Sequence, residues 1–225
     1  MLSYLFVKRN LIKRLIKKFG QTYAEELGIN LKSGKPSEIF KWFLASLLFG
    51  KRIGENIAMK TYRLFAEKGV LSPDKILQTG WDGLVKILDD GGYVRYDFST
   101  ADRLLEIMTE LKKKYNGSLE NLYKQSKNQK DLENRLQGFK GIGPVTTNIF
   151  LRELRDIWKV DPTLSPYVRL AAKNLGIKDP KRFWEKNKVR GKSFVNFEAA
   201  LLRLGKNFCH KEKCKICELV EECRK

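Results

Sequence analysis

Apolar residues recur at helical spacing along most of the chain, and no stretch shows the period-two alternation of a half-buried strand. The clearest case is residues 38–49, where apolar side chains lie on all sides of the predicted helix, as expected for a buried central helix. Ser37 can cap this helix, and Gly50 ends it. The pattern as a whole predicts an all-α protein.

Turn-forming and capping residues separate the other helical patterns. A helix is predicted to begin at Ser72-Pro73 and to end near Gly80, and another begins at Ser165-Pro166. Further helices are expected at 54–67, at 81–88, from a cap at Ser99 or Thr100 to Tyr115, at 119–125 with Ser118 as cap, and at 146–158.

Residues 1–19 form an amphipathic, basic pattern. Apolar Leu5, Leu11, Ile12, Leu15, Ile16 and Phe19 alternate with lysines and arginines. Charges interrupt the apolar positions, which excludes a secretory signal, and no apolar run in the chain reaches the length of a membrane span. We therefore expect a packed N-terminal helix with a solvated basic face, in preference to a helix on a membrane surface, in a cytoplasmic, nucleoid-associated protein.

Charge narrows the class of partner. The chain has 45 Lys and Arg residues against 26 Asp and Glu residues, which gives a net charge of +19. A Lys- and Glu-rich surface of the kind found in thermophiles would carry nearly as many acids as bases. The excess of positive charge instead favours a polyanionic partner, with nucleic acid first.

The stretch Phe139–Gly143 reads as a tight turn between two helices. Gly138, Gly141 and Gly143 supply positive φ angles or close backbone approach, and Pro144 stands where a helix places its first residue. The free amides of such a turn, together with the positive end of the second helix, can bind a phosphate group. The alternative is a plain helix–helix turn that binds no ligand.

All four cysteines lie near the C-terminal end, in the pattern C-x4-C-x2-C-x5-C. Four thiols at this spacing predict a metal site, not a disulfide framework. Cys209, Cys214, Cys217 and Cys223 could hold either a zinc ion or an iron–sulfur cluster. His210 adjoins the first of them, and we expect it to be a bystander.

These motifs together resemble the endonuclease III-like helix-hairpin-helix DNA glycosylase superfamily. The hairpin Gly141-Ile142-Gly143 matches that family's Gly-hydrophobic-Gly, and Val160-Asp161 matches its Val-Asp. Many members end in a 4Fe–4S loop of C-x6-C-x2-C-x5-C, whose last two spacings recur here. The resemblance implies a 4Fe–4S cluster in preference to zinc. It also implies two lobes: a six-helix domain at 36–157 with the hairpin, and a helical lobe from 1–35 and 158–225 with the cysteine loop at 209–223.

The resemblance further implies excision of a damaged or mismatched base from double-stranded DNA by a monomeric enzyme, with Asp161 as catalytic residue. A plain alternative for Asp161 is a cap on the following helix. The expected DNA contacts are Gly141, Ile142, Gly143, Val145, Lys140, Lys51 and Arg52.

Bifunctional members of the family carry a Schiff-base lysine two residues after the second hairpin glycine, where this chain has Val145. This favours a glycosylase without lyase activity. Two alternatives remain open. One is a bifunctional enzyme that uses another lysine, and the other is an inactive member that only binds DNA or acts as a scaffold.

Overall fold

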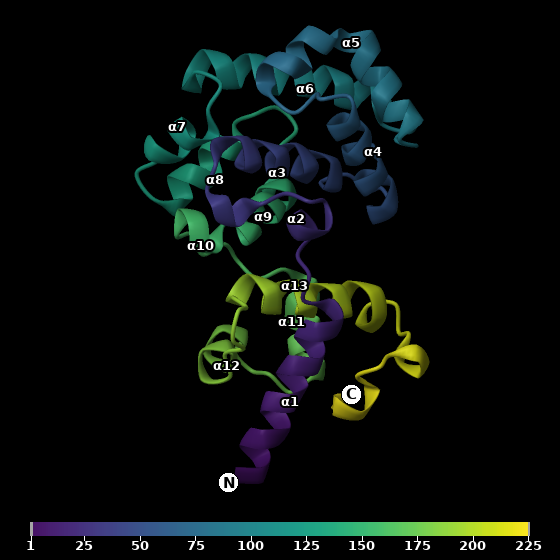
Figure 1. Cartoon of the computed structure of the whole chain (residues 1–225), viewed down its shortest axis with the longest axis vertical. Coiled ribbons are helices and arrows are strands. Elements are labelled where there is room, and N and C mark those ends of the chain that lie inside the picture. Colours follow the sequence, from purple (N-terminus) through teal and green to yellow (C-terminus); the bar gives the residue numbers. More distant parts are fainter. Residues whose placement is uncertain (1, 225) are drawn as a thin grey trace. The chain divides into compact units, whose positions relative to one another are not determined.

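The computed structural model describes the backbone of residues 2–224 and the side chains of residues 10–224. Within the described residues every regular element is a helix, so the predicted all-α class is confirmed (Figure 1). The chain divides into two compact units, one formed by Leu27–Pro162 and the other by Met1–Glu26 together with Thr163–Lys225.

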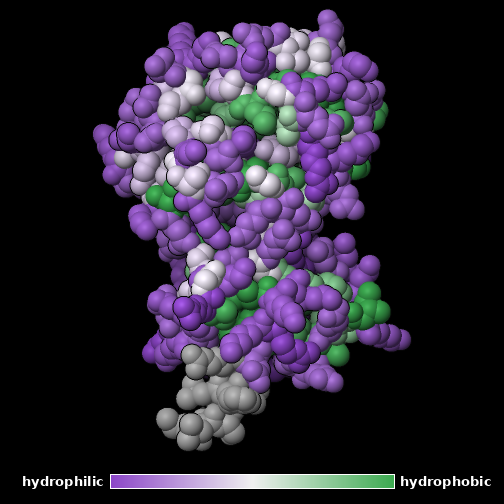
Figure 2. Space-filling view, viewed as in Figure 1, coloured by the Kyte–Doolittle hydropathy of each residue, from purple (hydrophilic) through white to green (hydrophobic). Residues whose placement is uncertain are grey.

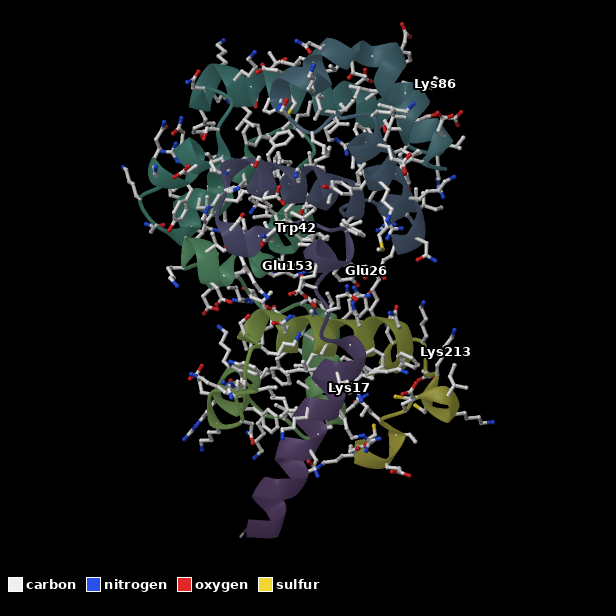
Figure 3. All side chains as sticks on the ribbon, in the orientation of Figure 1. Lys17, Glu26, Trp42, Lys86, Glu153 and Lys213 are labelled. Atoms are coloured by element: carbon white, nitrogen blue, oxygen red, sulfur yellow. The ribbon has the colours of Figure 1, made fainter. Side chains whose placement is uncertain are left out.

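The Leu27–Pro162 unit is built around the helix α3 (Pro36–Phe49). This helix packs against α4, α7 and α9 and thereby buries side chains on all its faces. Its Trp42, labelled in Figure 3, is fully buried and donates a hydrogen bond from Nε1 to the Phe150 carbonyl over 3.0 Å. The elements of the unit are η1 (Leu31–Ser33), α3, α4 (Glu55–Glu67), α5 (Pro73–Asp90), α6 (Asp97–Tyr115), α7 (Leu119–Lys124), α8 (Gln129–Gln137), α9 (Pro144–Glu153) and α10 (Arg155–Trp158).

Two predicted caps in this unit are wrong. Helix α3 begins at Pro36 with Lys35 as its cap residue, so Ser37 already lies inside the helix. Helix α6 begins at Asp97, before Ser99 and Thr100, and Thr100 is buried. In both cases the helix extends further towards the N-terminus than the last capping residue suggested, because the preceding backbone already has helical geometry.

Other local predictions for this unit are confirmed. Gly80 has φ 66° and ψ 177°, which breaks α5 into two helical segments where a boundary was expected. Ser118 caps α7 by accepting a hydrogen bond from the Asn121 amide over 3.2 Å. The continuous helix expected at 146–158 is confirmed only in part, because the helix is interrupted at Leu154, which separates α9 from α10.

The unit formed by both ends of the chain is centred on α13 (Phe194–Leu204), which packs against α1, α11, α12 and η2. Its elements are α1 (Leu2–Phe19), α2 (Tyr23–Glu26), α11 (Pro166–Asn174), α12 (Pro180–Lys186), α13, the π-helical turn η2 (Gly205–Cys209) and the 3-10 turns η3 (Cys214–Ile216) and η4 (Val220–Glu222). The amphipathic pattern of α1 is confirmed from residue 10 onward, because its apolar residues are buried and its lysines exposed. The side chain of Leu5 lies outside the described residues.

The surface is mostly hydrophilic on the face that Figure 2 shows, in both units, with smaller apolar patches between the hydrophilic residues. None of the helices described within residues 2–224 is both long and apolar enough to cross a membrane.

Candidate functional site

The hairpin between α8 and α9 owes its shape to one glycine. Gly141 has a φ of +79°, which disfavours residues with a side chain, whereas Gly138 has −67° and Gly143 has −100°. The Ile142 amide donates to the Phe139 carbonyl over 3.1 Å, and the Ile142 side chain is buried. Ile142 therefore anchors the turn to the core, and any ligand contact it makes must come from its backbone.

The outer side of the hairpin is open to a ligand. The amides of Gly141 and Gly143 donate to no acceptor within the described part of the chain. A β-carbon at Gly143 would have no atom within 4 Å. Gly143 is also the cap residue of α9, with Pro144 at the first helical position as predicted. Unpaired amides at the positive end of a helix favour a bound anion.

Tertiary packing brings further cations to the hairpin. A β-carbon at Gly50 would lie 2.1 Å from Thr146 Oγ1, so the end of α3 is pressed against the start of α9, and Lys51 and Arg52 follow directly. A β-carbon at Gly141 would lie 2.1 Å from the Nε atom of Arg103 on α6. Arg103 therefore covers the hairpin glycine, a placement that no spacing in the sequence indicated.

Lys51 and Arg103 are close enough for their charges to interact. Burial and the charge of Arg103 lower the pKa of Lys51. Lys51 Nζ also lies 6.0 Å from the ring centroid of Tyr96. Lys140 is differently placed, because its Nζ pairs with Glu106 Oε1 at 2.7 Å, and this hydrogen bond raises the pKa of Lys140. Lys51 and Arg103 thus form the positive patch beside the hairpin, while Lys140 is partly neutralised.

Asp161 is held by residues of its own unit. Arg155 Nη1 donates to Asp161 Oδ1 over 2.5 Å, and Arg155 Nη2 donates to the Pro162 carbonyl over 2.7 Å. The Asp161 amide donates to Gln129 Oε1 over 2.7 Å. The Arg155 side chain is 5% exposed, whereas the Asp161 side chain is 63% exposed. A buried arginine therefore fixes a carboxylate that solvent or a ligand can reach.

The alternative role for Asp161 as a helix cap is excluded by this geometry. The helix that follows, α11, begins at Pro166, as expected from Ser165-Pro166. It is capped by Ser165, whose Oγ accepts from the Val168 amide over 3.3 Å. Neither Arg155 nor Gln129 was singled out from the sequence. Arg155 lies six residues before Asp161, a spacing with no fixed meaning outside a continuous helix.

The four cysteines are all free and line one pocket, together with apolar side chains of α13 and the tail. Burial raises the pKa of Cys209, a hydrogen bond with Asn174 opposes this, and the charges of Cys214, Cys217 and Cys223 raise it further. Each thiolate thus increases the cost of ionising Cys209, and a bound cation would remove that cost.

The donor set of four thiols fits a metal group. The space between the cysteines is about 20 Å³. Among the described residues, no three His, Cys, Asp or Glu side chains are arranged to hold a metal ion. Binding of a zinc ion or a four-iron cluster by these thiols would be coupled to local folding of the loop.

Ion pairs and a ring contact hold the cysteine loop in place. Arg14 of α1 pairs with Glu222, and Lys18 Nζ lies 2.5 Å from Glu218 Oε1. The ring of His210 lies edge-on to that of Tyr167, with centroids 5.2 Å apart, which gives this histidine a packing role.

Compared with protein-family models and with curated protein sequences, the chain finds no match. The fold and these sites define an all-α protein of two helical units, one with a glycine hairpin and an aspartate held by an arginine, the other with a four-cysteine pocket.

Proposed function

We propose that this protein is a DNA glycosylase that removes a damaged or mismatched base from duplex DNA, and that it has the two-lobed endonuclease III-like fold. The observation that carries the proposal is the presence, in one helical unit, of a hairpin with open amides and of Asp161 held by Arg155. The first suits a DNA phosphate and the second suits the positive charge that develops as a glycosidic bond breaks.

Binding would use the phosphate backbone. The amides of Gly141 and Gly143 and the positive end of α9 would hold one phosphate, and Lys51, Arg52 and Arg103 would hold its neighbours. These contacts carry no sequence information, as expected for an enzyme that searches DNA for a lesion. The target base must then leave the stack, which costs on the order of a few kcal/mol and selects for weakly paired bases.

Base release would depend on Asp161. Its carboxylate would stabilise the cationic sugar or accept a proton from the attacking water, and Arg155 would keep the carboxylate in one position. Arg155 does not touch the substrate in this scheme and is a positioning residue. The 63% exposure of the Asp161 side chain leaves room for a substrate to approach it.

The reaction would stop at an intact abasic site. Val145, at the place of the family's lyase lysine, is 67% exposed and has no amine. Lys140, the lysine nearest in sequence to the hairpin, already pairs with Glu106. Water is therefore the proposed nucleophile.

The unit formed by the chain ends would carry a 4Fe–4S cluster, with zinc as the alternative. Cys209, Cys214, Cys217 and Cys223 would be its ligands, and the group would supply a rigid, positively flanked loop near DNA, because lysines surround the cysteines.

A panel of duplexes, each with a single lesion or mismatch, tests the proposal by chromatographic detection of free base. Release of one class of base, with the abasic strand left intact, is the expected result. Binding without any base release would instead support the inactive, DNA-binding alternative. Failure to bind any duplex at low salt would refute the proposal and favour a scaffold role.

A further inference from the structure

The cations of α1 form two sets with different surroundings. Arg14 and Lys18, four residues apart, pair with Glu222 and Glu218 of the cysteine loop. Lys13 and Lys17, also four residues apart, are exposed and have no carboxylate partner among the described residues. One face of α1 is thus neutralised by the tail and the adjacent face is not (Figure 3, which labels Lys17).

A turn from a distant part of the chain adds two more cations beside this face. Gly191 has a φ of +74°, and the Lys192 amide donates to the Val189 carbonyl over 3.1 Å. This hydrogen bond closes a tight turn. The turn leads directly into α13, where Ser193 Oγ accepts a hydrogen bond from the Val195 amide. Arg190 and Lys192 are exposed on the turn and have no carboxylate partner in the part of the chain that the structure describes.

The two segments line an open cavity of about 600 Å³. Lys13, Lys17, Arg190 and Lys192 line it, and Glu25 is the one carboxylate in its lining. Glu25 is turned towards the protein, where its Oε2 accepts from the Thr22 amide over 3.1 Å and from Asn196 Nδ2 over 3.4 Å. Four like charges around one cavity repel each other, and an anion between them would remove the repulsion.

We propose that this cavity binds phosphate groups, at least two at a time. Its volume lies within the roughly 300–1,000 Å³ of small-ligand sites. An arginine beside three lysines suits phosphate oxygens, which accept several charge-assisted hydrogen bonds at once. The lining has no aromatic residue on which a base could stack, so the phosphates alone provide recognition.

The phosphates can come from a nucleic-acid strand or from a free polyphosphate. Either source would occupy the same cations. The site lies in the unit without the hairpin and Asp161, so this inference does not rest on the proposed glycosylase activity, and each can fail alone.

The test is direct binding, at low salt, of two probes: inorganic tripolyphosphate by calorimetry and an undamaged single-stranded oligonucleotide by fluorescence anisotropy. The variant with Lys13→Gln and Lys17→Gln is compared with a matched control, Arg14→Gln with Lys18→Gln, which removes the same charge from the same helix. Thermal melting checks that both variants fold. Arg190→Gln tests the turn separately.

The cavity variant should bind at least one probe about tenfold or more weakly, and the control should change it less than about threefold. If the cavity variant binds both probes more weakly, the site recognises phosphate groups from either source. If it binds only the oligonucleotide more weakly, the site recognises the phosphates of a nucleic-acid strand. Equal loss in the two double variants, or an unchanged affinity in Arg190→Gln and the cavity variant, would overturn the proposal. So would failure of the wild type to bind either probe.

Discussion

Replacing Asp161 by asparagine separates catalysis from stability at the candidate active site. The change removes one negative charge but keeps an oxygen that can accept the hydrogen bond from Arg155 Nη1. Breaking a fully buried ion pair costs about 3–5 kcal/mol, whereas an exposed pair contributes at most about 1 kcal/mol. Arg155 is buried but the Asp161 side chain is 63% exposed, and Arg155 keeps its bond to Pro162. We therefore expect a stability loss of about 1 kcal/mol.

A loss of this size would lower the melting temperature of a 225-residue protein by only about 2–4 °C. Removal of a charge that stabilises the transition state should lower base release about 10²-fold or more. The two effects are therefore separable by single-turnover base release, duplex binding and thermal melting on the same samples. Binding should persist while release is lost.

Asp156→Asn is the matched control, because Asp156 is an exposed aspartate on α10, close in sequence to Asp161. It should retain wild-type base release. Full activity in Asp161→Asn would remove Asp161 from the mechanism. Equal losses in the two variants would show a general effect of charge and would refute the reasoning as well.

The other sites give four further predictions. Gly143→Val should fold normally, because the φ of Gly143 is −100° and the space around it is open. It should weaken binding to all duplexes and lower the slope of log affinity against log salt by about 0.9. Wild-type binding by this variant would show that the hairpin is merely structural. Gly141→Ala should destabilise the protein by about 1–2 kcal/mol, because the φ of Gly141 is +79° and a β-carbon there would displace Arg103. Chemical denaturation measures this, and an unchanged denaturation midpoint would contradict it. The purified protein should be yellow-brown and contain about four irons per chain. Cys217→Ser should lower both the iron content and the stability. One zinc and no iron in the wild type would support the alternative metal. Borohydride should trap no covalent DNA complex with the wild type, since Val145 has no amine, and efficient trapping would show that a lysine acts.

The local features of this fold could be predicted from sequence because they depend on neighbouring residues. Helical periodicity indicated an all-α chain, the buried face of α1 and the central helix α3. Ser118 was identified as a cap because it directly precedes a helix that its hydroxyl can reach, and Ser165-Pro166 was identified as a helix start. The caps at Ser37 and at Ser99 or Thr100 were wrong, since an N-cap depends on the backbone angles of the residues before it, and several polar residues compete for the position.

The candidate sites divide in the same way. The glycines of the hairpin, Asp161 and the cysteine spacing were visible in the sequence, because turn geometry and metal ligation require particular residue types at short spacing. Only the tertiary structure placed Arg103 over Gly141 and Arg155 beside Asp161. It also decided which cations of α1 pair with the tail and which line the open cavity. Long side chains on exposed or half-buried surfaces have many possible partners, and only the packing of distant segments determines which charges are paired and which remain open to a ligand.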